Sequence, residues 1–253
     1  MNMKGKGLYA IAAVAMCTVC IEAPAAKKTF SPGDNLAQIV NHTSADIQYV
    51  IGEGNVEIIG SEAALRNIHA SVSNRSLRVR YADNHNSVSS DVIIRVYSEN
   101  VGNFITYGSG DIKADRIEAV SVSLQSFGSG DITVGTVECT GLQIGIYGAG
   151  DITVDKSESS TVKTIVQGAG DITVRHVEAA SIEATMQGAG DIFMPSIDGA
   201  SVRVINQGAG DITLGGEVST AVLTGQGVGD INARNLKAVK TTKIKQGLGD
   251  IHN

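Results

Sequence analysis

One acidic residue recurs eight times at the same place in a repeated phrase, and these carboxylates are the side chains best placed to do chemistry. Each follows a Gly-x-Gly turn and precedes an isoleucine, so the phrase is Gly-x-Gly-Asp-Ile. A row of carboxylates could bind Ca²⁺ or another cation, or supply the paired acids of a glycosidase. The eight residues are Asp111, Asp131, Asp151, Asp171, Asp191, Asp211, Asp230 and Asp250.

A structural role for the aspartates competes with these chemical ones. Carboxylates stacked at about 4.8 Å repel by roughly 1 kcal/mol even in water, so we expect each Asp to accept backbone N–H bonds at its turn. The nonapeptide Ca²⁺ repeat needs a second Asp and a nine-residue period, which this chain lacks. A catalytic site is a local departure from a repeat, whereas this row is uniform. The pattern therefore predicts no catalytic residue, no metal ligand and no cofactor.

Two glycines flank the middle residue of every phrase. We expect them to adopt positive φ where the chain reverses from one sheet to the next. With the aspartates they form a predicted structural turn ladder. The glycines are Gly108, Gly110, Gly128, Gly130, Gly148, Gly150, Gly168, Gly170, Gly188, Gly190, Gly208, Gly210, Gly227, Gly229, Gly247 and Gly249.

A second row stands immediately before the glycine pairs. It begins with Tyr107, Phe127 and Tyr147 and continues as glutamines. We expect it to face outward, with rings packed face to edge and Gln amides bonded along the row, which is a structural interpretation. The alternative is that the three aromatic residues form an exposed binding platform for a glycan or peptide. The glutamines are Gln167, Gln187, Gln207, Gln226 and Gln246.

Other polar side chains offer little for catalysis. The five histidines share no repeat position, and His176 is expected to be a solvated loop residue. A row of glutamates is expected to form a solvated face, and Cys139 a small buried filler. These glutamates are Glu118, Glu138, Glu158 and Glu178.

The elements that position these rows follow from the repeat length. The phrases recur every twenty residues, except for nineteen between Gly208 and Gly227. Each repeat holds two stretches of alternating apolar residues, such as Asp151 to Val154 and Val162 to Val166, separated by a turn-forming pair such as Asp155-Lys156. One repeat cannot bury its own Ile and Val, so the coils must stack. The sequence predicts an all-β solenoid, a rod of roughly 34 Å.

Composition and charge agree with a narrow solenoid. The chain of 253 residues has no Trp, 4% aromatic residues, 42% hydrophobic residues and 30 glycines. Its net charge is −6. An acidic chain without a basic patch excludes a nucleic-acid partner.

Residues 1–25 are predicted to be a signal peptide. Lys4 and Lys6 precede an apolar stretch from Leu8 to Ile21, which is too short to span a bilayer, and small residues near Ala25 offer a cleavage site. Cys17 and Cys20 lie inside this segment, but neither follows the small residue that lipid attachment needs. We therefore expect an exported protein in the periplasm, at the outer-membrane surface or outside the cell. Whether it carries a lipid anchor stays open.

Residues 26–107 lack the regular phrase, apart from a faint echo at Gly52 to Val56. They contain several strand-like stretches and a short helix candidate at Ser61 to Ile68. We predict that they form an N-terminal β cap and the first coils, because terminal repeats of an array are atypical. Residues 108–253 form the solenoid with its eight phrases. The far end has no equivalent cover, which favours a homo-oligomer or another partner there.

The phrases from Gly108 to Ile112 and from Gly128 to Ile132, together with the strand Val120 to Leu124, resemble the putative auto-transporter adhesin, head GIN domain family. Ser61 to Tyr107 resembles the opening of that domain, and the likeness covers about residues 35 to 253. It implies a right-handed parallel β-helix of the pectin-lyase-like kind, an adhesive role in the envelope of gut Bacteroidetes and similar bacteria, and a trimer. No catalytic residues are recognised in the family. This chain departs from it in lacking a well-placed lipid-attachment Cys and a C-terminal translocator barrel.

Taken together, the sequence predicts an exported β-solenoid that works as an adhesin-like or scaffold protein and is not an enzyme. The expected partner is a glycan, or a protein surface of a host or of the envelope. The alternative is a carbohydrate-binding or carbohydrate-active protein of the pectin-lyase-like class. An enzyme of that class should show a cleft that interrupts the rows, whereas a scaffold should keep them unbroken.

Overall fold

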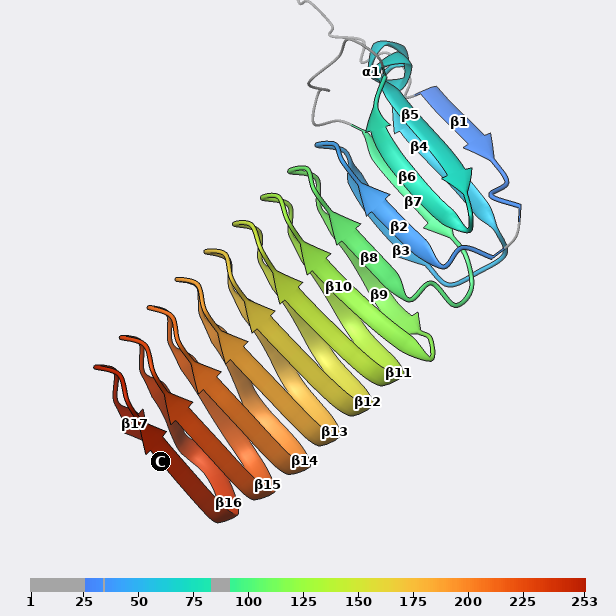
Figure 1. The fold of residues 1–253 in the computed structure, drawn as a ribbon. Coiled ribbons are helices and arrows are strands. Elements are labelled where there is room, and N and C mark those ends of the chain that lie inside the picture. Colours follow the sequence, from blue (N-terminus) through green and yellow to red (C-terminus); the bar gives the residue numbers. More distant parts are fainter. Residues whose placement is uncertain (1–25, 34, 83–91) are drawn as a thin grey trace, which may run out of the picture.

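The computed structural model describes residues 26–33, 35–82 and 92–253, and it is a β-solenoid of about 8 turns with roughly 20 residues per coil (Figure 1). The predicted fold class is confirmed. The predicted signal peptide lies outside the described residues. Within the described ranges, no helix is both long and apolar enough to cross a membrane.

The solenoid strands pair in parallel with their equivalents one coil away. In the pairing of β12 with β13, Ile152 lies beside Ile172 and Val166 beside Met186, twenty positions later. Every phrase therefore lies on its predecessor, as Figure 1 shows from green to red. The strands are β9 (Ile112–Glu118), β10 (Ser121–Ser126), β11 (Ile132–Ile146), β12 (Ile152–Val166), β13 (Ile172–Met186), β14 (Ile192–Asn206), β15 (Ile212–Gly225), β16 (Ile231–Lys245) and β17 (Ile251–His252).

Each coil buries alternate residues along both of its sides. In β12 the side chains of Ile152, Val154, Val162 and Val166 are at most 2% exposed. Burying an Ile or Val contributes about 1.5–3 kcal/mol, and the contribution is repeated in each coil. The core is thus a continuous apolar column along the rod.

The prediction of two separate strands per coil was wrong for β11 to β16. These strands run through the expected turn pairs, and in β12 the pairing with β13 skips only Asp155 and Ser160. Figure 1 shows each long strand folding back on itself at the end opposite the glycine turns. The chain can bend there without ending the strand because the residues on both sides of each skipped position still pair with the next coil.

The N-terminal strands are stacked in an order that differs from their order in the chain. β2 pairs with β6 and β8, and β3 pairs with β7 and β9, all in parallel. Residues 38–50 therefore form a coil of the stack, inserted between β6/β7 and β8/β9. The bounds are β1 (Ala26–Phe30), β2 (Gln38–Asn41), β3 (Asp46–Val50), β4 (Asn55–Gly60), β5 (Ile68–Ser73), β6 (Ser76–Tyr81), β7 (Ile93–Tyr97) and β8 (Asn103–Thr106).

The echo of the phrase is at His42 to Ile47 rather than at Gly52 to Val56. Ile47 pairs with Ile112, so Asp46 occupies the aspartate position of the inserted coil. The stretch predicted instead leads into β4, which is antiparallel to β1 and β7. Thr43 and Ala45 stand where later coils have glycine, which is why the glycine pattern did not reveal this coil.

Antiparallel strands lie beyond the parallel stack at its N-terminal end. β5 pairs with β6, and β4 pairs with β7 and β1. The short helix expected at Ser61 to Ile68 is present as α1 (Glu62–Asn67), and the Ser61 side chain accepts a bond from the Ala64 N–H at 3.2 Å. Figure 1 shows these elements gathered at the blue end of the molecule.

Candidate functional site

The aspartates form a continuous hydrogen-bonded ladder along the rod. The backbone N–H of Asp171 donates to Oδ1 of Asp151 at 2.8 Å, and the same bond recurs between all successive phrases at 2.7–3.1 Å. The ladder begins one coil earlier than predicted, because the Asp111 N–H donates to Asp46 at 3.0 Å. The carboxylates thus accept backbone N–H bonds, but from the next coil rather than from their own turn.

A backbone hydrogen bond joins the same two coils, with the donor on the earlier coil. The N–H of Ile152 donates to the carbonyl oxygen of Asp171 at 2.9 Å. Two bonds therefore join Asp171 to the phrase before it, one through a side chain and one through a carbonyl. Each coil is fixed in register by this pair of contacts.

A few cations compensate the charge of the row at its ends. Nζ of Lys113 lies 3.3 Å from Oδ2 of Asp111, and Nζ of Lys245 lies 2.5 Å from Oδ1 of Asp250. The bond and charge of Lys245 lower the pKa of the Asp250 carboxyl. Within the described ranges, no group of three or more His, Cys, Asp or Glu side chains is placed to hold a metal ion.

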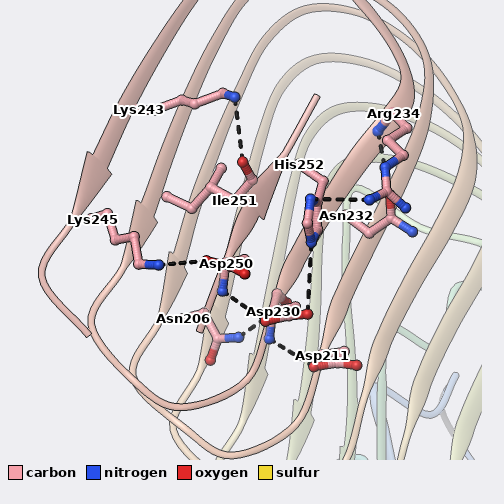
Figure 2. A network of polar contacts seen from close by, with 10 residues as sticks. All are labelled: Asn206, Asp211, Asp230, Asn232, Arg234, Lys243, Lys245, Asp250, Ile251 and His252. Atoms are coloured by element: carbon pink, nitrogen blue, oxygen red, sulfur yellow. Dashed lines mark hydrogen bonds and ion pairs between the residues drawn. The ribbon is translucent and has the colours of Figure 1, made fainter. Parts of the chain in front are cut away.

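The last coil carries lysines where earlier coils carry apolar residues (Figure 2). Lys243 pairs with buried Leu223, and Lys245 pairs with Gly225. Lys243 donates to the carbonyl oxygen of Ile251 at 3.3 Å. The C-terminal end of the rod, which was expected to lack a cover, thus carries polar side chains in its last coil.

The turn glycines are required by close approach, and the predicted positive φ was wrong. Among the described residues, only Gly33 and Gly216 are glycines with positive φ. A Cβ on Gly170 would lie well under 3.0 Å from the carbonyl oxygen of Gly150, and every other turn glycine meets the same obstacle. The coils stack so tightly at this edge that only a hydrogen fits between them.

The aromatic residues form a stack of rings rather than the expected face-to-edge row. The centroids of Tyr107 and Phe127 are 4.9 Å apart and those of Phe127 and Tyr147 are 4.6 Å apart, with planes inclined by 16° and 10°. His42, which sequence reasoning missed, extends the stack at 4.8 Å from Tyr107. Because neighbours cover the ring faces inside the stack, solvent reaches these rings mainly at their edges. The binding platform stays a prediction.

The glutamine row is bonded as expected. Each Nε2 donates to the Oε1 of the next glutamine, at 2.8 Å from Gln167 to Gln187 and at 2.7–3.1 Å along the rest of the row to Gln246. The row runs along the rod without a break.

The glutamate row is paired with cations. Lys156 Nζ lies 2.5 Å from Glu158 and 3.3 Å from Glu178, while Arg116 contacts Glu118 and Glu138. The hydrogen bond and charge of Lys156 lower the pKa of Glu158. The sequence analysis predicted a solvated face and did not predict these ion pairs with Lys156 and Arg116.

The remaining candidates have simple surroundings. His176 is exposed, as expected of a solvated residue. Cys139 is half-buried against the core, and burial raises the pKa of its thiol.

One residue interrupts the regular outward rows in the middle of the rod. Phe193 pairs with Thr173 and Thr213 and is 41% exposed. It lines a hollow of about 280 Å³ with Asp171, Asp191 and Asp211. The register of β14 and β15 shifts between Met194 and Ile197, in the coil pair that leads into the nineteen-residue step. The sequence signal was a Phe in a position that holds Thr in the coils on either side, at Thr153, Thr173 and Thr213.

Comparison with known proteins supplies a family and a set of similar folds. The sequence matches the family model described as "Putative auto-transporter adhesin, head GIN domain" at residues 35–194 and 166–252. Among curated proteins, no sequence matches.

Solved structures of other bacterial proteins share the fold. A putative adhesin from Bacteroides fragilis NCTC 9343 is similar with a TM-score of 0.71 at 18% identity, covering 92% of this chain and 98% of the other. A putative lipid binding protein from Parabacteroides distasonis ATCC 8503 gives 0.77 at 14% identity, covering 91% and 97%. A putative adhesin from the same organism gives 0.73 at 15%, covering 91% and 98%. At these identities the likeness concerns the fold alone.

Proposed function

The chain belongs to the putative auto-transporter adhesin, head GIN domain family, and we propose that it is an exported, adhesin-like β-solenoid that acts by display and binding without catalysing a reaction. The rod presents outward rows to a partner, which we propose to be a glycan, or a protein surface of a host or of the envelope.

The observation that carries this proposal is the uniform use of the aspartates. From Asp111 to Asp230, each carboxylate accepts the backbone N–H of the next coil, so each carboxylate in this series serves the scaffold. General acid–base catalysis instead needs a carboxyl whose surroundings set it apart from its neighbours. The regular row supports a scaffold.

The proposed location rests on the composition of residues 1–25 and on the family. A basic start, an apolar stretch and small residues near Ala25 are typical of a signal peptide. We propose that the mature protein lies at the cell surface. The homo-oligomer, and the trimer implied by the family, are part of the same proposal.

The test is protease treatment of intact cells that produce the protein, followed by an adherence assay. Added protease should remove the protein from intact cells, and its loss should reduce adherence to glycan-coated or host-cell surfaces. A variant without residues 1–25 is the matched control, because it should stay inside the cell and be protected. Full protection of the parent protein in intact cells, or unchanged adherence after its removal, would contradict the proposal.

A second candidate function is carbohydrate processing at Phe193. An exposed ring beside three carboxylates is a combination that sugar-active proteins use, since the ring packs on the sugar and acids bond its hydroxyls. Release of reducing ends from plant or bacterial polysaccharides, abolished in Asp191→Asn, would favour it. If no reducing ends are released from any of the plant and bacterial polysaccharides tested, carbohydrate processing at Phe193 is excluded.

A further inference from the structure

A hollow lies where the N-terminal strands meet the regular coils. It has a volume of about 610 Å³ and is open to solvent. Four segments form it: the start of β2, the turn between β5 and β6, the connection from β7 to β8, and the corner before β10. We propose that this junction hollow is a binding site for an uncharged, hydroxyl-rich ligand, namely a sugar unit of a glycan.

The side chains that line the junction hollow are amides and hydroxyls. Among the described residues, no Asp, Glu, His, Lys or Arg lines it, whereas Gln38, Asn74, Asn100, Asn103, Ser121 and Ser123 do. Amides and hydroxyls both donate and accept hydrogen bonds, so they match sugar hydroxyls, and they do not select a charged ligand. Ala37, Ala119 and Val120 add apolar surface against which the C–H groups of a sugar can pack.

Three of these polar side chains lie side by side on adjacent strands. Asn103 of β8 pairs with Gln38 of β2 on one side and with Ser123 of β10 on the other. Neighbours outside the hollow orient this row. Ser76 donates to Oε1 of Gln38 at 3.0 Å, and Gln125 donates to Oγ of Ser123 at 3.1 Å. Both bonds use acceptor atoms, so Gln38 and Ser123 keep donor groups for a ligand.

The middle residue of the row has an unsatisfied acceptor. Oδ1 of Asn103 is buried and has no hydrogen-bond partner, a condition shared in the described residues only by Oγ1 of Thr164 inside the core. A buried acceptor without a partner is unfavourable, and a hydroxyl donor from a ligand would satisfy it once the Asn103 side chain turns this oxygen toward the hollow. This atom indicates the kind of group that the site needs.

The rim of the hollow is held in uncommon backbone conformations. All described non-glycine residues with positive φ belong to its rim segments: Asn74 at 51°, Arg75 at 60° and Asn100 at 58°. At the base, a Cβ on Gly102 would lie well under 3.0 Å from the carbonyl oxygen of Ser121. Asn74 and Arg75 are the two-residue turn of the β5–β6 hairpin, and such turns require positive φ at both positions. The rim is thus built to a fixed shape.

The position in the fold also separates this site from the repeat. Here the chain leaves the inserted coil, passes through the antiparallel strands and returns at β8, so the four segments that line the hollow meet at this junction. The inference rests on the proposed adhesin-like function only for its biological role, because it supplies the ligand class that an adhesin would recognise.

The test measures binding of the purified full chain to an array of oligosaccharides ending in glucose, galactose, mannose or N-acetylglucosamine, with sialylated glycans for comparison. We expect binding to at least one uncharged glycan. Asn103→Leu should weaken it at least ten-fold without lowering the unfolding temperature, since it also removes the unsatisfied acceptor. Gln143→Leu, in the same row one coil beyond Ser123 and outside the hollow, is the matched control and should bind like the parent.

A second pair of variants keeps the test valid if Asn103→Leu fails to fold. Val120 is 83% exposed at the rim, and Val239 is 90% exposed at the equivalent corner of the last coil. Val120→Glu should lower the affinity at least ten-fold, whereas Val239→Glu should not. No binding to any uncharged glycan, binding to sialylated glycans alone, or equal effects of the two Glu variants would overturn the inference. None of these outcomes on purified protein alters the protease and adherence test of the proposed function.

Discussion

Each aspartate of the ladder joins two coils through its side chain and its backbone at once. Asp171 donates its N–H to Asp151 and accepts, at its carbonyl oxygen, the N–H of Ile152. The position therefore needs an acceptor at the place of Oδ1, and it does not need a negative charge. Asparagine offers the same acceptor and would also relieve the repulsion between neighbouring carboxylates.

The first prediction separates the acceptor from the charge. Asp171→Ala should destabilise the protein by about 0.5–1.5 kcal/mol, because the N–H of Asp191 loses its partner. Asp171→Asn should be at least as stable as the parent. Thermal unfolding of the two variants checks this, and equal losses in both would show that the charge itself matters. Calorimetric titration with Ca²⁺ should give no heat with the parent.

The second prediction concerns the close approach at the turns. Gly170→Ala should cost about 1–3 kcal/mol or more, because its Cβ would collide with the carbonyl oxygen of Gly150. Ala169→Val is the control, since this exposed position holds Val228 in a later coil, and its effect should stay within about 0.5 kcal/mol. Urea unfolding measures both. A Gly170→Ala protein as stable as the parent would contradict the stacking geometry.

For single residues, the sequence predicted which positions form rows along the rod. It did not predict in every case what the residue at such a position does. The twenty-residue period placed the Asp and Gln rows correctly because identical residues at a fixed interval must stack. The role of the glycines depends on how closely the carbonyl oxygens of the neighbouring coil approach them, and the sequence does not reveal this distance. His42 and Asp46 were missed because Thr43 and Ala45 replace the glycines that mark the other coils.

Among the elements, the ring stack connects the inserted coil to the regular ones. His42 lies on the turn between β2 and β3 and stacks on Tyr107. Its edge is exposed while one face is covered, and this partial burial, together with the charge of Arg78, lowers the pKa of His42. The folded protein thus favours the neutral imidazole.

The third prediction follows from the direction of that shift. A histidine whose pKa is lowered in the folded state contributes its full stability above about pH 6.5, and the contribution falls as the pH drops below that value. The unfolding temperature should therefore fall between pH 7.5 and 5, and it should fall less in His42→Phe, which keeps the stack without the titration. Identical pH profiles for the two proteins would contradict this account.

The strands show where sequence reasoning about elements reaches its limit. The apolar alternation predicts the two sides of β12 correctly, but the pair Asp155-Lys156 predicts a turn between them where the strand continues. Turn-forming residues such as Asp155 and Lys156 signal a bend in the chain. They cannot reveal that pairing with adjacent coils continues through the bend, because that pairing is made between residues twenty positions apart.

Over the whole molecule, charge is distributed unevenly along the rod. Residues 99–230 contain 17 acidic and 6 basic residues, a net charge of −11, whereas residues 231–253 contain 5 basic and 1 acidic, a net charge of +4. Lysines in positions that are apolar in other coils disfavour the addition of a further strand, a known protection of sheet edges.

The order of the N-terminal coils could not be predicted from the sequence. The pairing of β2 with β6 and β8 joins residues that do not recur at a fixed interval, so it leaves no periodic signal.

The fourth prediction tests whether the lysines of the last coil protect the exposed sheet edge. Lys243→Val combined with Lys245→Val should expose an apolar strand face and promote self-association at micromolar concentration, measured by sedimentation velocity. Lys237→Val with Lys240→Val removes the same charge from the same coil, at positions that pair with exposed Glu217 and Thr220, and should have a smaller effect. An unchanged sedimentation coefficient in the first variant would show that these lysines do not protect the edge.

The most direct test of the stacked coils is the distance between spin labels placed on the turns. In a protein whose three cysteines are replaced, one pair would join Ser129 to Ala209, four coils apart, and another would join Ser129 to Leu248, six coils apart. At about 4.8 Å per coil, the backbone separations should be about 19 Å and about 29 Å. Pulsed electron resonance should find the second distance longer by about 10 Å. Distances that are equal, or that shrink with the number of coils, would contradict the ladder and everything derived from it.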